Sequence, residues 1–234
     1  MESYGDYSSL LMSAIGLKYE PVAVSIFKKG DPVPEGYQTP ERPVRHCQAI
    51  MRARRGETLL VTPDSMACPV GGSSLGLLPV PDKVAAGEFH FKLGMFSSPE
   101  AAKEMIDQRP SLESESVDAV LVAPLSKARE RPDVVIVTGV PEQVYWLAPA
   151  AATYNGGGRI DLSTAAFQAC CADSTLIPYL QGSINMSLGC FGCRKSTDIA
   201  PEEMIVGIPF SRLPEIVKVV DKLKDGPIPK TRSK

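Results

Sequence analysis

Four runs of β-branched and almost uncharged residues predict buried strands. They lie at residues 22–27, 117–123, 134–139 and 204–209. β-Branched side chains pack well on a pleated sheet, and a strand that is buried on both faces has a continuous apolar sequence. Shorter apolar runs at residues 58–62 and 184–188 predict two more strands.

A further strand is predicted over residues 88–96, where Phe89 and Phe91 alternate with His90 and Lys92. A period of two is typical of a strand with one buried and one solvated face. On this pattern His90 points to the face opposite the phenylalanines. We therefore expect His90 to face solvent and to take no part in catalysis.

Helices are predicted between the strands, from apolar residues at helical spacing and from capping residues, at residues 4–17, 43–55, 98–108 and 213–224. Strands and helices interleave without strict alternation, and no internal repeat is present. The sequence thus predicts a single α/β domain over residues 1–225, with a mixed β-sheet flanked by helices. Residues 226–234 are polar and basic and are predicted to form a disordered tail.

Composition narrows the range of partners. Of the 234 residues, 44% are hydrophobic and 22% are charged, as in ordinary globular proteins. The net charge of −2 argues against a large phosphate-neutralising surface, so nucleic acid is not an expected partner. Neither a signal peptide nor a membrane span is predicted, and we expect a cytoplasmic protein without membrane contact. Its cysteines should then be reduced thiols or metal ligands and not disulfides.

The cysteines supply the candidate chemistry. Four of the six lie within residues 162–193, a stretch in which Asp173 is the only charged side chain, and Arg194 and Lys195 follow it directly. These four are Cys170, Cys171, Cys190 and Cys193. An anionic metal–thiolate centre needs thiolates whose charge is held by hydrogen bonds, by nearby cations or by the metal itself. The pattern favours metal or redox chemistry over the alternative that these cysteines are small buried hydrophobes.

The other two cysteines stand apart in the sequence. Cys47 lies on the apolar stripe of the helix predicted at residues 43–55, and both a core role and a ligand role are open for it. Cys68 precedes Pro69 within a glycine-rich loop, and a Cys-Pro step is common beside cluster ligands. The loop can turn backbone N–H groups toward an anion. It lacks the Gly-Lys-Ser/Thr end of a nucleotide-binding P-loop.

Three kinds of site compete for the Cys190-Phe-Gly-Cys193 motif. A dithiol oxidoreductase needs its Cys-x-x-Cys motif at the start of a helix, and the short distance to the strand at residue 204 leaves little room for one. A structural zinc site commonly uses two such motifs, and the adjacent Cys170 and Cys171 make a poor second one. An iron–sulfur cluster tolerates ligands that are scattered along the chain.

We therefore predict an iron–sulfur cluster, of the four-iron kind, with zinc as the alternative. The predicted ligands are Cys68, Cys171 (or Cys170), Cys190 and Cys193. The expected cofactor-binding groups are backbone N–H groups of nearby glycines and one arginine: Gly71, Gly72, Gly189, Gly192 and Arg194. Because Cys68 is far from the others in sequence, this hypothesis requires the fold to bring it close to residues 171–193.

Several motifs make the chain resemble the family known as domain of unknown function 169. They are RHCQA at residues 45–49, ACP at 67–69, LGL at 75–77, SSPEAAK at 97–103, VAPL at 122–125, NMSLGCFGCRK at 185–195 and EMIVGIP at 203–209. The resemblance covers most of the chain. It implies a protein of archaeal or anaerobic bacterial type with recurring cysteines, and it brings no settled activity with it.

The resemblance also bears on the ligands. By the family's pattern the recurrent cysteines match Cys47, Cys68, Cys171 and Cys190. Cys193 stands where many relatives have another residue, so the family's site can use Cys47 in place of Cys193; Cys170 looks like an addition. We expect an iron–sulfur protein of anaerobic metabolism with an electron-transfer or redox role, served by a redox partner or a small-molecule substrate. The alternative is a non-redox protein that binds a small anion and whose cysteines are structural.

Overall fold

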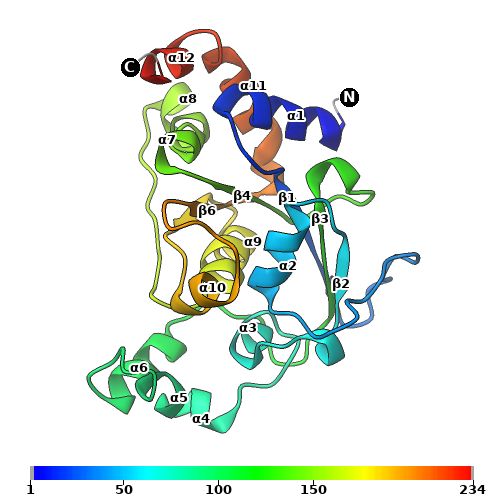
Figure 1. Cartoon of the computed structure of the whole chain (residues 1–234), viewed down its shortest axis with the longest axis vertical. Coiled ribbons are helices and arrows are strands. Elements are labelled where there is room, and N and C mark those ends of the chain that lie inside the picture. The colour runs from blue at the N-terminus through cyan, green and yellow to red at the C-terminus, as the bar shows by residue number, and fades with distance from the viewer. Residues whose placement is uncertain (1–2, 233–234) are drawn as a thin grey trace.

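The computed structural model describes residues 3–232 of the chain, and one six-stranded sheet lies at its centre (Figure 1). The strand order is β2-β3-β1-β4-β6-β5, and every pairing between these strands is antiparallel. The strands are β1 (Val22–Lys28), β2 (Leu59–Val61), β3 (Val117–Pro124), β4 (Val134–Gly139), β5 (Asn185–Ser187) and β6 (Met204–Pro209). The α/β class is confirmed, and the four predicted buried strands are confirmed as β1, β3, β4 and β6. The sheet of the described residues is antiparallel throughout and is not the mixed sheet that was predicted.

The helices around the sheet largely follow the sequence pattern. They are α1 (Tyr4–Ile15), α2 (His46–Ala53), α3 (Pro69–Ser74), α4 (Asp82–Ala85), α5 (Glu88–Phe91), α6 (Pro99–Asp107), α7 (Pro141–Val144), α8 (Tyr154–Gly156), α9 (Ile177–Gln181), α10 (Phe191–Ser196), α11 (Leu213–Leu223) and α12 (Pro227–Arg232). The predicted helices are confirmed as α1, α2, α6 and α11. A π-helical segment at Ala169–Leu176 runs directly into α9. No helix within residues 3–232 is both long and apolar enough to cross a membrane.

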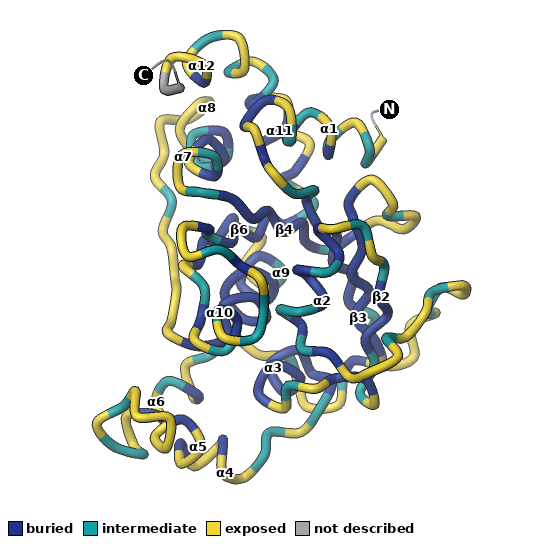
Figure 2. The backbone as a smooth tube through the Cα atoms, in the orientation of Figure 1, coloured by how far each residue is buried: buried dark blue, intermediate teal, exposed yellow. Residues whose placement is uncertain are grey.

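Side chains on the two faces of the sheet form the two largest cores. On one face Val22 and Val24 of β1 pack with α2 and with the cysteines. On the other face Ala23 belongs to a cluster with α1 and α11. Successive side chains of a strand point to opposite faces, so this division follows from the strand geometry. The strands are therefore buried, whereas the outer sides of the surrounding helices and loops are exposed (Figure 2).

Residues 88–96 do not form the predicted strand. They begin with α5, and the burial is the reverse of the prediction, with His90 2% exposed and Phe89 44% exposed. The reason lies at Gly87, whose φ of +76° directs the chain into a turn against α6. A Cβ atom at Gly87 would lie 2.1 Å from the carbonyl oxygen of Pro99, so only glycine permits this approach. Together, α4, α5 and α6 form a helical cap at the end of the molecule opposite the two termini (Figure 1).

Two segments expected to be irregular contain helices. The glycine-rich segment contains α3, and both Gly71 and Gly72 lie inside that helix. The tail predicted to be disordered contains α12, in which Ile228 is 1% exposed and belongs to the same apolar cluster as α1 and α11. An apolar anchor of this kind favours an ordered segment over a solvated tail. Residues 233–234 lie outside the described part of the chain.

Gly207 of β6 determines how closely the π-helical segment packs on the sheet. A Cβ atom at this position would lie 2.0 Å from the carbonyl oxygen of Ser174. Because that oxygen is backbone, Gly207→Ala should push the segment away and lower the free energy of unfolding by about 1–3 kcal/mol, as overpacking does. Urea denaturation measures this change. The control is Gly226→Ala, where a Cβ atom meets nothing within 4 Å. Equal stability of the two variants would contradict the close packing.

Candidate functional site

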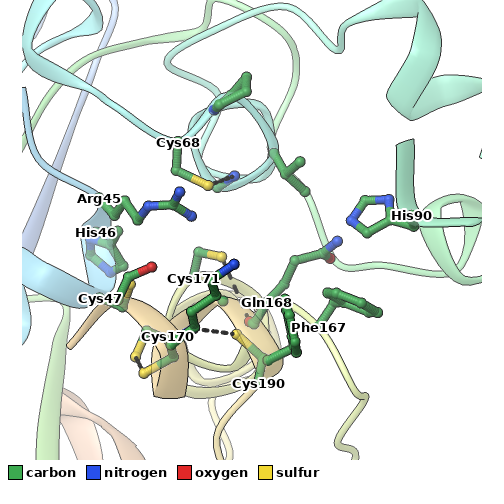
Figure 3. A pocket seen from close by; sticks show the side chains of 18 of the residues that line it. Arg45, His46, Cys47, Cys68, His90, Phe167, Gln168, Cys170, Cys171 and Cys190 are labelled. Atoms are coloured by element: carbon green, nitrogen blue, oxygen red, sulfur yellow. Dashed lines mark hydrogen bonds between the residues drawn. The ribbon is translucent and has the colours of Figure 1, made fainter. Parts of the chain in front are cut away.

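All six cysteines line a single cavity of about 300 Å³ on the α2 side of the sheet (Figure 3). Cys47 comes from α2, Cys68 precedes α3, Cys170 and Cys171 come from the π-helical segment, Cys190 precedes α10 and Cys193 lies within it. All six are free thiols. We call this cavity the cysteine pocket. The fold thus brings Cys68 to the Cys171–Cys193 region, as the cluster hypothesis requires.

Three of the thiols form what we call the Cys171 group, made up of Cys68, Cys171 and Cys190. Cys68 and Cys190 each cap a short helix, and their Sγ atoms accept the N–H groups of Gly71 and Cys193, both at 3.3 Å. A Cβ atom at Gly71 would lie 3.5 Å from the Sγ atom of Cys68 and 3.6 Å from that of Cys171, so these two sulfurs face one point. Burial raises the pKa of Cys171, and the neighbouring charges of Cys68 and Cys190 add to the effect.

The other three thiols form the Cys193 group, made up of Cys47, Cys170 and Cys193. The Sγ atoms of Cys170 and Cys193 lie 3.6 Å apart. Hydrogen bonds from Cys170 and Cys47 lower the pKa of Cys193 to about 3, because they stabilise its thiolate. The same hydrogen bonds, together with burial, raise the pKa of Cys47 and of Cys170. The three thiols therefore favour one shared negative charge over several, because each deprotonation raises the cost of the next.

His46 contributes an unpartnered nitrogen to the wall of the pocket. The Thr175 hydroxyl donates to the carbonyl oxygen of Cys170 at 2.6 Å, so it accepts from the Nε2–H group of His46 at 2.9 Å. This assigns a lone pair to Nδ1, which is buried and has no hydrogen-bond partner among the described residues. Burial lowers the pKa of His46 to about 4, so the ring is neutral at physiological pH.

The mouth of the pocket is aromatic. His90 lies 4.7 Å, ring to ring, from Phe167, and Phe89 and Phe191 also line the cavity. The Nδ1 atom of His90 is buried without a partner among the described residues. Next to Phe167, Gln168 has a φ of +67°, a left-handed conformation that is strained for any residue with a Cβ atom and that recurs at functional sites.

The fixed charges at the pocket are positive. Arg45 and Lys195 line it, and no aspartate or glutamate is found among its lining residues in the described chain. Lys195 also lies over the ring of Phe191, with Nζ 5.7 Å from the ring centroid. These two cations would therefore stabilise a negatively charged group in the pocket, whether that group is a thiolate, a metal cluster or a small ligand.

The predicted cofactor-binding residues divide between the pocket and its surroundings. Gly71 and Gly192 line the cavity. Gly72 packs against Leu78 and Met66 instead, and Gly189 lies in a left-handed turn. Arg194 is not a lining residue. Its guanidinium donates to backbone carbonyl groups, those of Leu188, Ala200, Pro201 and Glu203, and so holds the loop after α10 in place.

Sequence reasoning missed three pocket residues that now stand out, namely His46, His90 and Arg45. For His46 and Arg45 the RHCQA motif was the available signal, because it surrounds Cys47. No sequence signal indicated His90, because the alternation at residues 88–96 predicted that its side chain faces solvent. Both histidines of the chain line the cysteine pocket.

The donor set limits which inorganic groups suit the pocket. Within residues 3–232 no three His, Cys, Asp or Glu side chains are arranged to hold a single metal ion. A single tetrahedral zinc requires its sulfur ligands about 2.3 Å from one centre. A four-iron cluster takes four thiolates that stand around a larger group. The thiols of the cysteine pocket come from separate segments and line one cavity, so they supply the sulfur donors that such a cluster would use.

Comparison with known proteins gives a family and one curated relative. The profile of DUF169, described as uncharacterised ArCR, matches residues 10–219. A protein of Methanocaldococcus jannaschii, itself described as uncharacterised, is 35% identical over 216 residues, which cover 92% of this chain and 92% of the relative. No solved structure matches.

Proposed function

This chain belongs to the DUF169 family, and we propose that it is an iron–sulfur protein. The cluster is held in the cysteine pocket and serves electron transfer or a redox reaction on a small molecule. The observation that carries the proposal is the convergence of six free thiols from separate segments on one cavity. Unrelated structural cysteines would be spread over the core. Here every cysteine of the chain lines the same wall.

Groups around the sulfurs support an anionic centre. The N–H groups of Gly71 and Cys193 already point at the sulfurs of Cys68 and Cys190. Hydrogen bonds of this kind stabilise a thiolate and tune the reduction potential of a cluster. The cations Arg45 and Lys195 compensate negative charge at the same pocket. When bound, a cluster supplies one-electron redox chemistry, and the protein's part is to hold it, to screen it from water and to set its potential.

A second candidate function rests on the charges alone. The cations Arg45 and Lys195 make the pocket suitable for a small anion without any metal. The glycine-rich segment gives this alternative no support, because the N–H group of Gly71 is used by the Cys68 sulfur. An anion-binding function would leave the six thiols as packing groups only.

Anaerobic purification and reconstitution test the proposal. We expect the protein to bind iron and acid-labile sulfide in similar amounts, to absorb broadly in the visible range and to bleach on reduction. Zinc is measured in the same samples, and protein with alkylated thiols is the control for adhering iron. Wild-type protein that holds neither metal after reconstitution would leave the anion-binding alternative. Stoichiometric zinc without sulfide would indicate a zinc site.

A further inference from the structure

The two cations at the mouth of the cysteine pocket have no acidic partner. Arg45 is half-buried just before α2, and its guanidinium points into the cavity (Figure 3). Lys195 is exposed at the same mouth. Neither side chain forms an ion pair with a carboxylate of residues 3–232. Both charges are therefore free to pair with an anion that enters from solvent.

Both cations lie next to the ring of Phe191 at the start of α10. The Nζ atom of Lys195 is 5.7 Å from the centroid of that ring. A Cβ atom on the following residue, Gly192, would lie 3.8 Å from the Nη1 atom of Arg45. Phe191 itself is 40% exposed. An accessible ring thus lies beside two positive groups, which suits a ligand whose own ring carries a negative group at its edge.

Three further rings line the same cavity, namely those of Phe89, His90 and Phe167. The ring of Phe167 lies 6.2 Å from that of Phe191 and 4.7 Å from that of His90, centroid to centroid. Phe96 stacks on Phe167 at 5.6 Å with an interplanar angle of 22°, and so holds that ring in place. Flat ligands pack on such rings in offset-stacked or edge-to-face geometry, which adds to the gain from burying apolar area.

We propose that the mouth of the cysteine pocket binds an aromatic carboxylate, whose ring packs on Phe167 and Phe191 and whose carboxylate pairs with Arg45 and Lys195. The cavity of about 300 Å³ is at the small end for ligand pockets, so it suits a compound with a single ring. A carboxylate carries one charge and costs less to bring into an apolar mouth than a phosphate dianion does. The planar guanidinium of Arg45 also matches a carboxylate in bidentate geometry.

This inference deepens the proposed function and rests on it in one respect, namely that the aromatic carboxylate is the small molecule that the cluster serves. The groups that bind the ligand need no metal. They also lie on the accessible side of the pocket, since Phe191 and Lys195 are exposed, whereas the six thiols are buried or half-buried. The ligand therefore reaches these groups from solvent without passing the thiols.

Calorimetric titration with benzoate tests the binding, on full-length reduced protein in both its metal-free and its reconstituted form. Cyclohexanecarboxylate has the charge without the aromatic ring, and we expect it to bind about two- to tenfold more weakly than benzoate. Benzamide has the ring without the charge, and we expect it to bind about tenfold more weakly or less tightly still. Either compound, or inorganic phosphate, binding as tightly as benzoate would overturn the proposal.

The two forms of the protein separate this inference from the proposed function. Metal-free protein that binds benzoate but takes up no iron on reconstitution would refute the cluster and keep the binding site. Reconstituted protein that holds iron and sulfide but binds no benzoate would refute the aromatic carboxylate as ligand and keep the cluster.

Single substitutions separate the contact to the charge from the contact to the ring. Lys195→Met and Arg45→Met should each weaken benzoate and cyclohexanecarboxylate alike, by about tenfold, because both compounds carry the carboxylate. Phe191→Leu should weaken benzoate alone and so bring the two affinities together. The control is Lys218→Met, an exposed lysine of α11 on the other face of the sheet, which should change neither. Equal effects of Lys195→Met and Lys218→Met would contradict the site.

Chemical protection locates the site in the wild-type protein and does not depend on how a variant folds. Saturating benzoate should slow the acetylation of Lys195 by an amine-reactive reagent and leave that of Lys218 unchanged, as measured by mass spectrometry of the peptides. Lys195 that reacts at the same rate with and without bound benzoate would place the ligand elsewhere and overturn the proposal.

Discussion

Arg54→Met is expected to lower the free energy of unfolding by about 3–5 kcal/mol, the cost of breaking a buried ion pair by removing one partner. Arg54 is the C-cap residue that follows α2, and its side chain is 0% exposed. Its Nη1 atom donates to both carboxylate oxygens of Glu203, at 3.0 Å and 3.1 Å, and to the Thr138 hydroxyl at 3.1 Å. Without the guanidinium, the Glu203 carboxylate is buried with no cation beside it. Urea or thermal denaturation of the metal-free protein measures the loss.

Arg55 provides a matched control. It is the next residue, its side chain is 49% exposed, and it pairs with Asp198, which pairs with Arg54 as well, at 3.2 Å. Arg55→Met should therefore cost no more than about 1 kcal/mol, as exposed ion pairs do. The double variant Arg54→Met/Glu203→Leu removes both charges and should recover much of the loss, because an apolar pair leaves no unpaired charge. A double variant less stable than Arg54→Met would show that the cost comes from lost packing and not from the stranded carboxylate.

The strands were predictable because local composition and tertiary environment agree. The β-branched runs that became β1, β3, β4 and β6 are buried on both faces, and such positions select the residues that favour strands. Residues 88–96 show the opposite case. Their alternation of apolar and polar residues is short, and the turn at Gly87 against Pro99 decides the structure. The pattern of residues 88–96 alone cannot predict this contact, because the contact involves a second segment of the helical cap.

The sequence predicted which residue types form the candidate site, but it did not predict which cysteines lie next to one another. The cysteines and their spacing pointed to thiol or metal chemistry. Their division into the Cys171 group and the Cys193 group depends on which side chains meet across α2, α3, α10 and the π-helical segment. The adjacent Cys170 and Cys171 illustrate the point. They belong to different groups, because successive residues of a helix diverge, and sequence alone cannot say which neighbour each one finds.

Replacing Cys171 or Cys190 with serine is expected to remove most of the bound iron and the visible absorption. A serine hydroxyl seldom ionises, so it is a poor substitute for a thiolate ligand. Cys171 faces the same point as Cys68, and Cys190 already receives a backbone hydrogen bond at its sulfur. Iron and sulfide analysis after anaerobic reconstitution measures the effect. Cys170→Ser is the matched control, a buried cysteine in the same pocket that should keep the cluster.

Cys47 and Cys193 are the two candidates for the fourth ligand of the cluster, and serine variants distinguish between them. Because Cys193 pairs with Cys170 at 3.6 Å, we expect Cys47 to complete the set, so that Cys47→Ser bleaches the protein and Cys193→Ser leaves its spectrum intact. The opposite result would make Cys193 the ligand. Six serine variants that all retain iron would contradict a thiolate-bound cluster. Variants that differ only in stability, by about 1–3 kcal/mol for a buried hydroxyl, would leave the cysteines with a packing role.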